Sequence, residues 1–167
     1  MRAIVVYESI WGNTGQLARE VAAGLGAERI DVVDAASAPA TLEADVDLLV
    51  VGGPTHAFSM STASTRESAK QQGADQIPAR GIREWIEELS SPGHAVPVAT
   101  FDTRVVTPRL PGSAAKKAMK RLVALGFRPL AKPETFGVHG YSGPVADGEL
   151  DRARQWGTEL AELLPRR

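Results

Sequence analysis

Hydroxyl and amide side chains gather at residues 9–14, Ser-Ile-Trp-Gly-Asn-Thr, directly after an apolar run. Ser9, Asn13 and Thr14 stand beside backbone N–H groups that the first turn of a following helix leaves without partners. These N–H groups and the positive end of the helix dipole favour a phosphate, and Gly12 allows the backbone to approach it closely. Neither G-x-G-x-x-G nor G-x-x-x-x-G-K-[ST] is present, so the stretch indicates a mononucleotide seat or, alternatively, an ordinary capped turn without a ligand.

Residues 52–56, Gly-Gly-Pro-Thr-His, follow the strongest apolar run of the chain and form a second candidate binding loop. Small residues here would let a flat ring lie against the backbone. His56 is the candidate for proton transfer near such a ring, because the reference pKa of histidine, about 6.5, is close to neutral pH. His94 and His139 are expected at the surface. Three scattered histidines without any cysteine or local carboxylate cluster do not predict a metal site.

The motif Ser9-x-Trp11-Gly12-x-Thr14 resembles the flavodoxin phosphate loop, usually written T/S-x-T-G-x-T, which wraps the phosphate of FMN. Trp11 stands where that family commonly has a second threonine, and it is expected either to cover the flavin ring or to pack beneath its own loop. The resemblance implies FMN as the cofactor, bound by the loops after three strands of the sheet. The residues implied to bind FMN are Ser9, Ile10, Trp11, Gly12, Asn13, Thr14, Pro54, Thr55, His56, Phe58, Phe101, Asp102, Thr103 and Arg104.

The resemblance also implies how the flavin ring is held. In flavodoxins, aromatic side chains of the second and third loops stack on the ring, commonly Trp and Tyr, and this chain offers His56, Phe58 and Phe101 at the matching places. Asp102 and Thr103 are expected to hydrogen-bond the pyrimidine edge of the ring. The FMN would carry the redox chemistry, so no catalytic side chain is implied beyond a role for His56.

Apolar patterning predicts the elements that must position these loops. Apolar and β-branched runs predict strands at residues 4–6, 30–33, 46–51 and 95–101, and an interrupted last strand at 127–130 and 134–138. Apolar residues at helical spacing predict helices at 14–25, 82–89, 113–125 and 148–164. A further short helix is expected at 40–43.

Strands that alternate with helices form a parallel sheet through right-handed crossovers. Ligands collect outside the carboxyl ends of such strands, so the loops after the first and third strands should face one crevice. Together with the resemblance, this predicts an α/β, flavodoxin-like fold: a doubly wound five-stranded parallel sheet in the order 2-1-3-4-5, with helices on both faces. The length of 167 residues fits a single flavodoxin-like domain over residues 1–167.

Residues 57–80 form a long connection that is rich in hydroxyl side chains and has no clear apolar period. A connection of this length inside a compact domain is usually functional or mobile. It is expected to be a lid over the flavin or part of a partner surface, or else a solvated insertion with some helix at 65–72.

Charge and composition restrict the partners. The formal net charge is −1, from 19 Lys plus Arg against 20 Asp plus Glu, which gives no overall field to attract nucleic acid or an anionic membrane. Electron-carrying flavodoxins are typically strongly acidic, so this chain departs from the resemblance. Lys116, Lys117, Lys120 and Arg121 predict a basic helix face that is solvated or meets an acidic redox partner. Short apolar runs and the lack of a signal-peptide pattern predict a cytoplasmic protein without membrane insertion.

Three functions remain open at this point. The first is an FMN-binding, flavodoxin-like electron-transfer protein that docks with a redox partner protein. The second is a flavodoxin-like NAD(P)H-dependent quinone reductase that passes electrons to a small acceptor such as a quinone, favoured by the near-neutral charge and the long connection at 57–80. The third is a flavodoxin-fold binding or regulatory module that has lost FMN, favoured by Trp11 and by the lack of Trp and Tyr at the ring-facing places. Fold alone does not choose among them.

Overall fold

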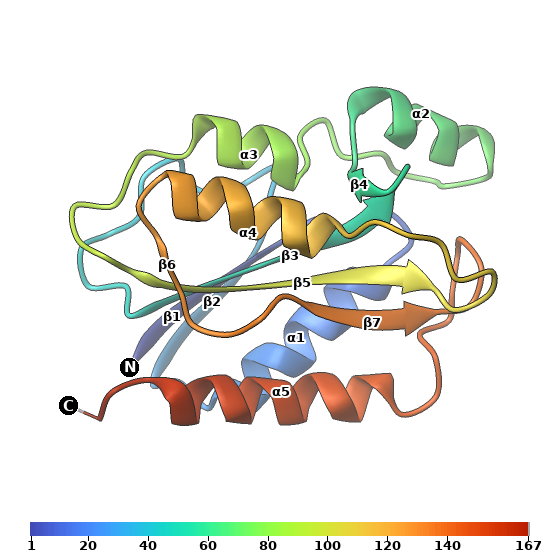
Figure 1. Cartoon of the computed structure of the whole chain (residues 1–167). Helices are drawn as coiled ribbons and strands as arrows, with labels where there is room; N and C mark the ends of the chain where they lie inside the picture. Colours follow the sequence, from blue (N-terminus) through green and yellow to red (C-terminus); the bar gives the residue numbers. More distant parts are fainter. Residues whose placement is uncertain (167) are drawn as a thin grey trace.

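The strands form one sheet in the order β2-β1-β3-β5-β6 (Figure 1). The structure is a computed structural model that describes residues 1–166 of the chain. The main strands are β1 (Arg2–Tyr7), β2 (Arg29–Asp34), β3 (Leu48–His56), β5 (Pro97–Val105), β6 (Arg128–Pro129) and β7 (Glu134–Val138). All of these pair in parallel, and both β6 and β7 pair with β5. The two-residue β4 (Ser59–Met60) pairs antiparallel with the end of β3.

Helices cover both faces of the sheet (Figure 1). They are α1 (Asn13–Leu25), α2 (Ala63–Gln71), α3 (Ile82–Glu88), α4 (Ala114–Ala124) and α5 (Glu149–Leu163). One apolar cluster joins the sheet to α1 and α5, and the other joins it to α3 and α4. Val5 belongs to the first cluster and Val6 to the second, because successive strand residues point to opposite faces. The continuous apolar run of β1 therefore fills two cores, as the sequence predicts.

The order of the strands confirms the predicted fold. Counting β6 and β7 together as the interrupted last strand, the observed order is the predicted 2-1-3-4-5. Parallel pairing brings the carboxyl ends of β1, β3 and β5 to one edge, where α2 also stands (Figure 1). None of the helices within residues 1–166 is both long and apolar enough to cross a membrane.

The predicted helix at 40–43 is wrong, because that stretch is irregular. Tertiary hydrogen bonds hold the chain there instead. The indole Nε1 of Trp85 donates to the carbonyl of Pro39 at 2.9 Å, and the guanidinium of Arg80 donates to the carbonyl of Ala38 at 2.9 Å. Carbonyls that are engaged by neighbouring side chains in this way are not available to a helical turn, and Pro39 supplies no N–H group.

Candidate functional site

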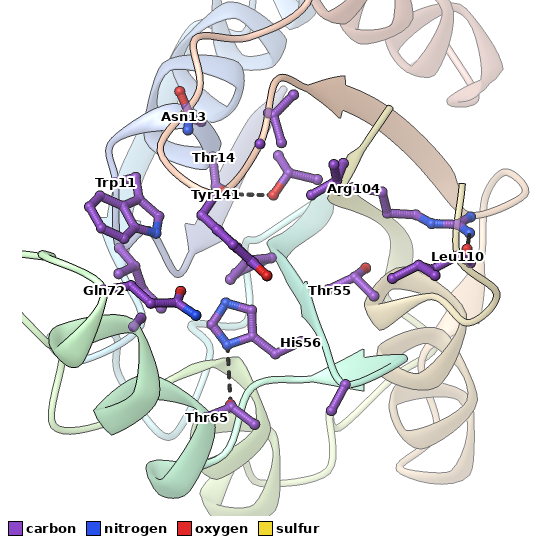
Figure 2. A pocket seen from close by; sticks show the side chains of 18 of the residues that line it. Trp11, Asn13, Thr14, Thr55, His56, Thr65, Gln72, Arg104, Leu110 and Tyr141 are labelled. Atoms are coloured by element: carbon purple, nitrogen blue, oxygen red, sulfur yellow. Dashed lines mark hydrogen bonds between the residues drawn. The ribbon is translucent and has the colours of Figure 1, made fainter. Parts of the chain in front are cut away.

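A cavity of about 320 Å³ lies at the carboxyl edge of the sheet (Figure 2). Four segments, residues 9–14, 54–58, 103–111 and 138–141, surround this carboxyl-edge pocket, and we call them the rim loops. The helix α2 closes one side with Thr65, Ser68 and Ala69, together with its C-cap residue Gln72. The volume is within the range of small-molecule sites, about 300 to 1,000 Å³.

Most residues that the sequence assigns to FMN line this pocket. They are Ser9, Ile10, Trp11, Asn13, Thr14, Pro54, Thr55, His56, Phe58, Thr103 and Arg104. Gly12 lies in the same rim loop and precedes α1 with a φ of +92°, a left-handed conformation that glycine adopts without steric cost. The parallel sheet thus brings the first three predicted loops together at one edge.

Phe101 and Asp102 do not reach the pocket, because β5 continues through them to Val105 instead of ending at residue 101. Phe101 is fully buried on the face of the sheet that α1 and α5 cover, and its ring centroid is 6.1 Å from that of Trp156 in an edge-on contact. Asp102 is also fully buried. Its Oδ2 accepts hydrogen bonds from the backbone N–H of Ala115, at 3.0 Å, and from the hydroxyl of Ser113. Phe101 is therefore not a ring partner, and Asp102 anchors the start of α4.

The start of α1 leaves backbone donors without protein partners. Within residues 1–166, the N–H groups of Asn13 and Thr14 make no hydrogen bond, and the N–H of Gly15 donates to Ser9 Oγ at 3.2 Å. The first turn contains no acidic residue, and Gly12 supplies no capping side chain. Free N–H groups and the positive end of the helix dipole favour an anion at this position.

The hydroxyl of Thr14 ties this turn to the neighbouring strand. Its Oγ1 lies 3.1 Å from Oγ1 of Thr103 on β5, and only 3% of Thr14 is exposed. Both residues line the pocket. A hydroxyl can donate one hydrogen bond and accept others, so this pair retains capacity for a bound polar group.

His56 holds a fixed place on the opposite wall. Its Nδ1 lies 3.1 Å from Oγ1 of Thr65, which itself belongs to the N-terminal capping box of α2. Burial lowers the pKa of His56, and the positive charge of Arg66 lowers it further, so the ring is neutral at pH 7. Figure 2 shows the free edge of the ring facing the side chains of Tyr141 and Gln72. This wall of the pocket therefore offers polar groups that can orient a ligand.

A buried polar network beneath the pocket was not predicted from the sequence. The carboxyl of Glu8, directly after β1, is fully buried and accepts from the backbone N–H of Ile82 at 2.9 Å and from the hydroxyl of Ser61. Arg66 donates to Ser61 Oγ at 2.9 Å and forms an ion pair with Glu84. Burial raises the pKa of Glu8, and its hydrogen bonds act against that rise. The network fastens α2 to the sheet and to α3, so the long connection before α3 forms a wall of the pocket.

The sequence also missed the fourth rim loop as part of the site. Tyr141 and Gly140 line the pocket, whereas His139 does not and is exposed, as expected for it. The Gly-rich run with an aromatic residue at 139–144 was a signal, but its position depends on the pairing of β7 with β5.

No protein-family model matches this sequence, and no curated protein sequence matches it. Its structure is similar to that of flavodoxin 1 from Bacillus cereus, with a TM-score of 0.70 and 16% identity over 99% of this chain and 100% of that chain. A flavodoxin from the domain Archaea gives a TM-score of 0.63 and 18% identity over 97% of each chain. The flavodoxin, WrbA-like protein from Agrobacterium tumefaciens gives a TM-score of 0.57 and 18% identity over 97% of this chain and 96% of that chain. The fold of this chain is flavodoxin-like.

Proposed function

We propose that this chain, with its flavodoxin-like fold, binds FMN in the carboxyl-edge pocket and acts as a flavodoxin-like electron-transfer protein. The observation that carries the proposal is the start of α1. There, the N–H groups of Asn13 and Thr14 have no protein partner within residues 1–166, at the edge of a pocket large enough for a small molecule. A phosphate supplies the acceptor oxygens and the negative charge that such a turn favours.

Different residues of the pocket fit the phosphate and the flavin ring of FMN. The first rim loop would hold the phosphate through its N–H groups and through the hydroxyls of Ser9 and Thr14. The flavin ring would lie toward His56, Phe58 and Tyr141, which also line the pocket. Bound FMN supplies the electron-transfer chemistry, and the protein orients it and limits its contact with water. Neutral His56 can hold or accept a proton beside the ring.

A second candidate function is an FMN-dependent quinone reductase that uses NADH or NADPH. The polar wall formed by His56, Gln72 and Tyr141 favours it, because such a wall could orient a small acceptor such as a quinone. The two functions differ in a simple assay. Rapid quinone-dependent oxidation of NADH or NADPH would support the reductase, and a stable reduced flavin without nicotinamide turnover would support the carrier.

The test of FMN binding is a fluorescence titration with FMN, riboflavin and FAD, alongside an absorbance spectrum of the purified protein. We expect FMN to bind at least about tenfold more tightly than riboflavin, because hydrogen bonds to a charged group contribute about 1.5 to 3 kcal/mol each. Equal affinities would contradict the phosphate seat. No flavin band and no saturable quenching would favour the module that has lost FMN.

A further inference from the structure

The charged side chains of the rim loops have one sign. The rim loops contain Arg104 and Arg109 and no aspartate or glutamate. The first turn of α4, which follows directly, adds the exposed side chains of Lys116 and Lys117. On α2, the exposed Glu67 is balanced by Lys70. The net charge of the whole chain is −1, so this positive surface is a local feature.

Three of these cations have no acidic partner among residues 1–166. Within residues 1–166, no ion pair involves Arg109, Lys116 or Lys117. Some arginines elsewhere on the surface, such as Arg80 and Arg154, pair with glutamates, whereas the exposed Arg19 and Arg128 form no ion pair within residues 1–166. The rim cations are thus free to interact with another molecule.

The lysines of α4 also oppose the helix in which they lie. The N-terminus of a helix carries a partial positive charge, which favours acidic residues and disfavours lysine in the first turn. Lys116 and Lys117 therefore act against the stability of α4. Their position shortly after the rim loop 103–111 is explained better by binding than by folding.

Exposed apolar side chains lie among these cations. Phe58 is 52% exposed, Leu110 53% and Tyr141 69%, and all three line the pocket. Phe58 has a φ of +67°, a conformation that is unfavourable for a residue of its size. Gly112 packs directly on its backbone, since a Cβ atom there would lie 2.3 Å from the carbonyl oxygen of Phe58. This arrangement holds an exposed aromatic ring at the mouth.

We propose that this mouth is a docking surface for an acidic one-electron redox protein. In the proposed complex the exposed apolar side chains would form the centre of the surface and the unpaired cations its rim, which is the common arrangement of protein interfaces. Opposite charge would steer the partner to the edge where FMN is proposed to bind, so the inference rests on that function. The partner's redox centre loses one electron as the FMN gains it, or the reverse, and no bond forms between the proteins.

The test measures binding of the full chain to a purified acidic [2Fe–2S] ferredoxin by biolayer interferometry, in 20 mM and 300 mM NaCl. We expect binding at low salt that weakens about tenfold or more at high salt, and no binding to a basic cytochrome c. The variant Arg109→Glu/Lys116→Glu should weaken binding about tenfold. The matched control is Arg128→Glu/Lys132→Glu, which makes the same charge change at exposed residues outside the rim loops and should change binding less than about twofold.

Three results would overturn the proposal: no salt-dependent binding of the ferredoxin, equal loss in the control, or preference for the basic protein. Binding of NADPH that depends on Arg109 and Lys116, without binding of the ferredoxin, would also overturn it in favour of a small anionic cosubstrate. The measurement is made on ligand-free and FMN-treated protein. Ferredoxin binding without FMN binding would contradict the proposed cofactor and support the docking surface. FMN binding without ferredoxin binding would support the cofactor and contradict the docking surface.

Discussion

Helices α1 and α4 both begin at the carboxyl edge of the sheet, but their first turns are satisfied in different ways. At α4, side-chain oxygens of Thr55, Asp102 and Ser113 accept hydrogen bonds from backbone N–H groups at 3.0 to 3.2 Å. At α1, the N–H groups of Asn13 and Thr14 have no partner within residues 1–166. The same helical geometry thus serves folding at α4 and is left available for a ligand at α1.

The comparison separates two properties that a helix start can have. Asp102 and Ser113, which close the first turn of α4 and do not line the pocket, should contribute to the free energy of unfolding and leave ligand affinity unchanged. Groups around the first turn of α1 should affect the binding of a phosphate and contribute less to folding. Substitutions at the two helix starts therefore test whether these roles are separate.

Asp102→Ala should have the largest effect and should act on stability. It removes a buried carboxylate that accepts from Ser113 and Ala115 and leaves both donors buried without that acceptor. We expect the free energy of unfolding to fall by about 2 to 3 kcal/mol, measured by urea denaturation. The ratio of FMN to riboflavin affinity should be unchanged. A change in that ratio with little loss of stability would show that the first turn of α4 also contributes to phosphate binding.

Thr14→Val tests the start of α1 and should act on affinity. Loss of the hydroxyl should weaken FMN binding by about 1 to 3 kcal/mol by removing a hydrogen bond to a charged group, with the fold intact. Riboflavin lacks the phosphate and should be affected much less. The matched control is Thr103→Val, which breaks the same 3.1 Å contact from the other side and should alter FMN and riboflavin alike. Unchanged FMN affinity in Thr14→Val would count against the phosphate seat.

Ser113→Ala should have a smaller effect of the same kind as Asp102→Ala. Ser113 is the N-cap of α4, and its Oγ accepts from the N–H of Lys116 at 3.2 Å. Removing an N-cap hydroxyl costs about 1 kcal/mol of stability, which urea denaturation would detect. FMN titration of the same variant should match the wild type. Weaker FMN binding here would mean that the two helix starts are coupled.

The sequence predicted β1 and β3 well because each contains a continuous apolar run. Alternate residues of β1 and β3 fill the two apolar clusters, and such burial on both faces needs no knowledge of the tertiary contacts. The end of β5 was harder to predict, because Asp102 and Thr103 are polar and resemble loop residues. Pairing with β7 continues the strand through them, and the buried carboxyl is satisfied by α4.

Some parts of the site could also be predicted from the sequence, and others required the structure. The first rim loop carries a local motif, so its place beside the pocket could be predicted from residues 9–14 alone. The position of Tyr141 follows from long-range pairing of β7, and that of Arg66 from a buried network centred on Glu8. Neither pairing nor a polar network leaves a periodic pattern in the sequence, so these parts required the structure.

Asn13→Asp should have the smallest effect on stability, and it should change stability and FMN affinity in opposite directions. The substitution keeps the shape of the side chain and places a negative charge in the first turn of α1, which has no acidic residue of its own. Interaction with the helix dipole should raise the stability of the ligand-free protein by about 0.3 to 1 kcal/mol. The same charge should repel the phosphate of FMN and weaken its binding, while riboflavin binding stays unchanged. Thermal unfolding without ligand and paired titrations measure the two effects. If this variant gained stability and still bound FMN as the wild type does, the open start of α1 would not be where the phosphate binds.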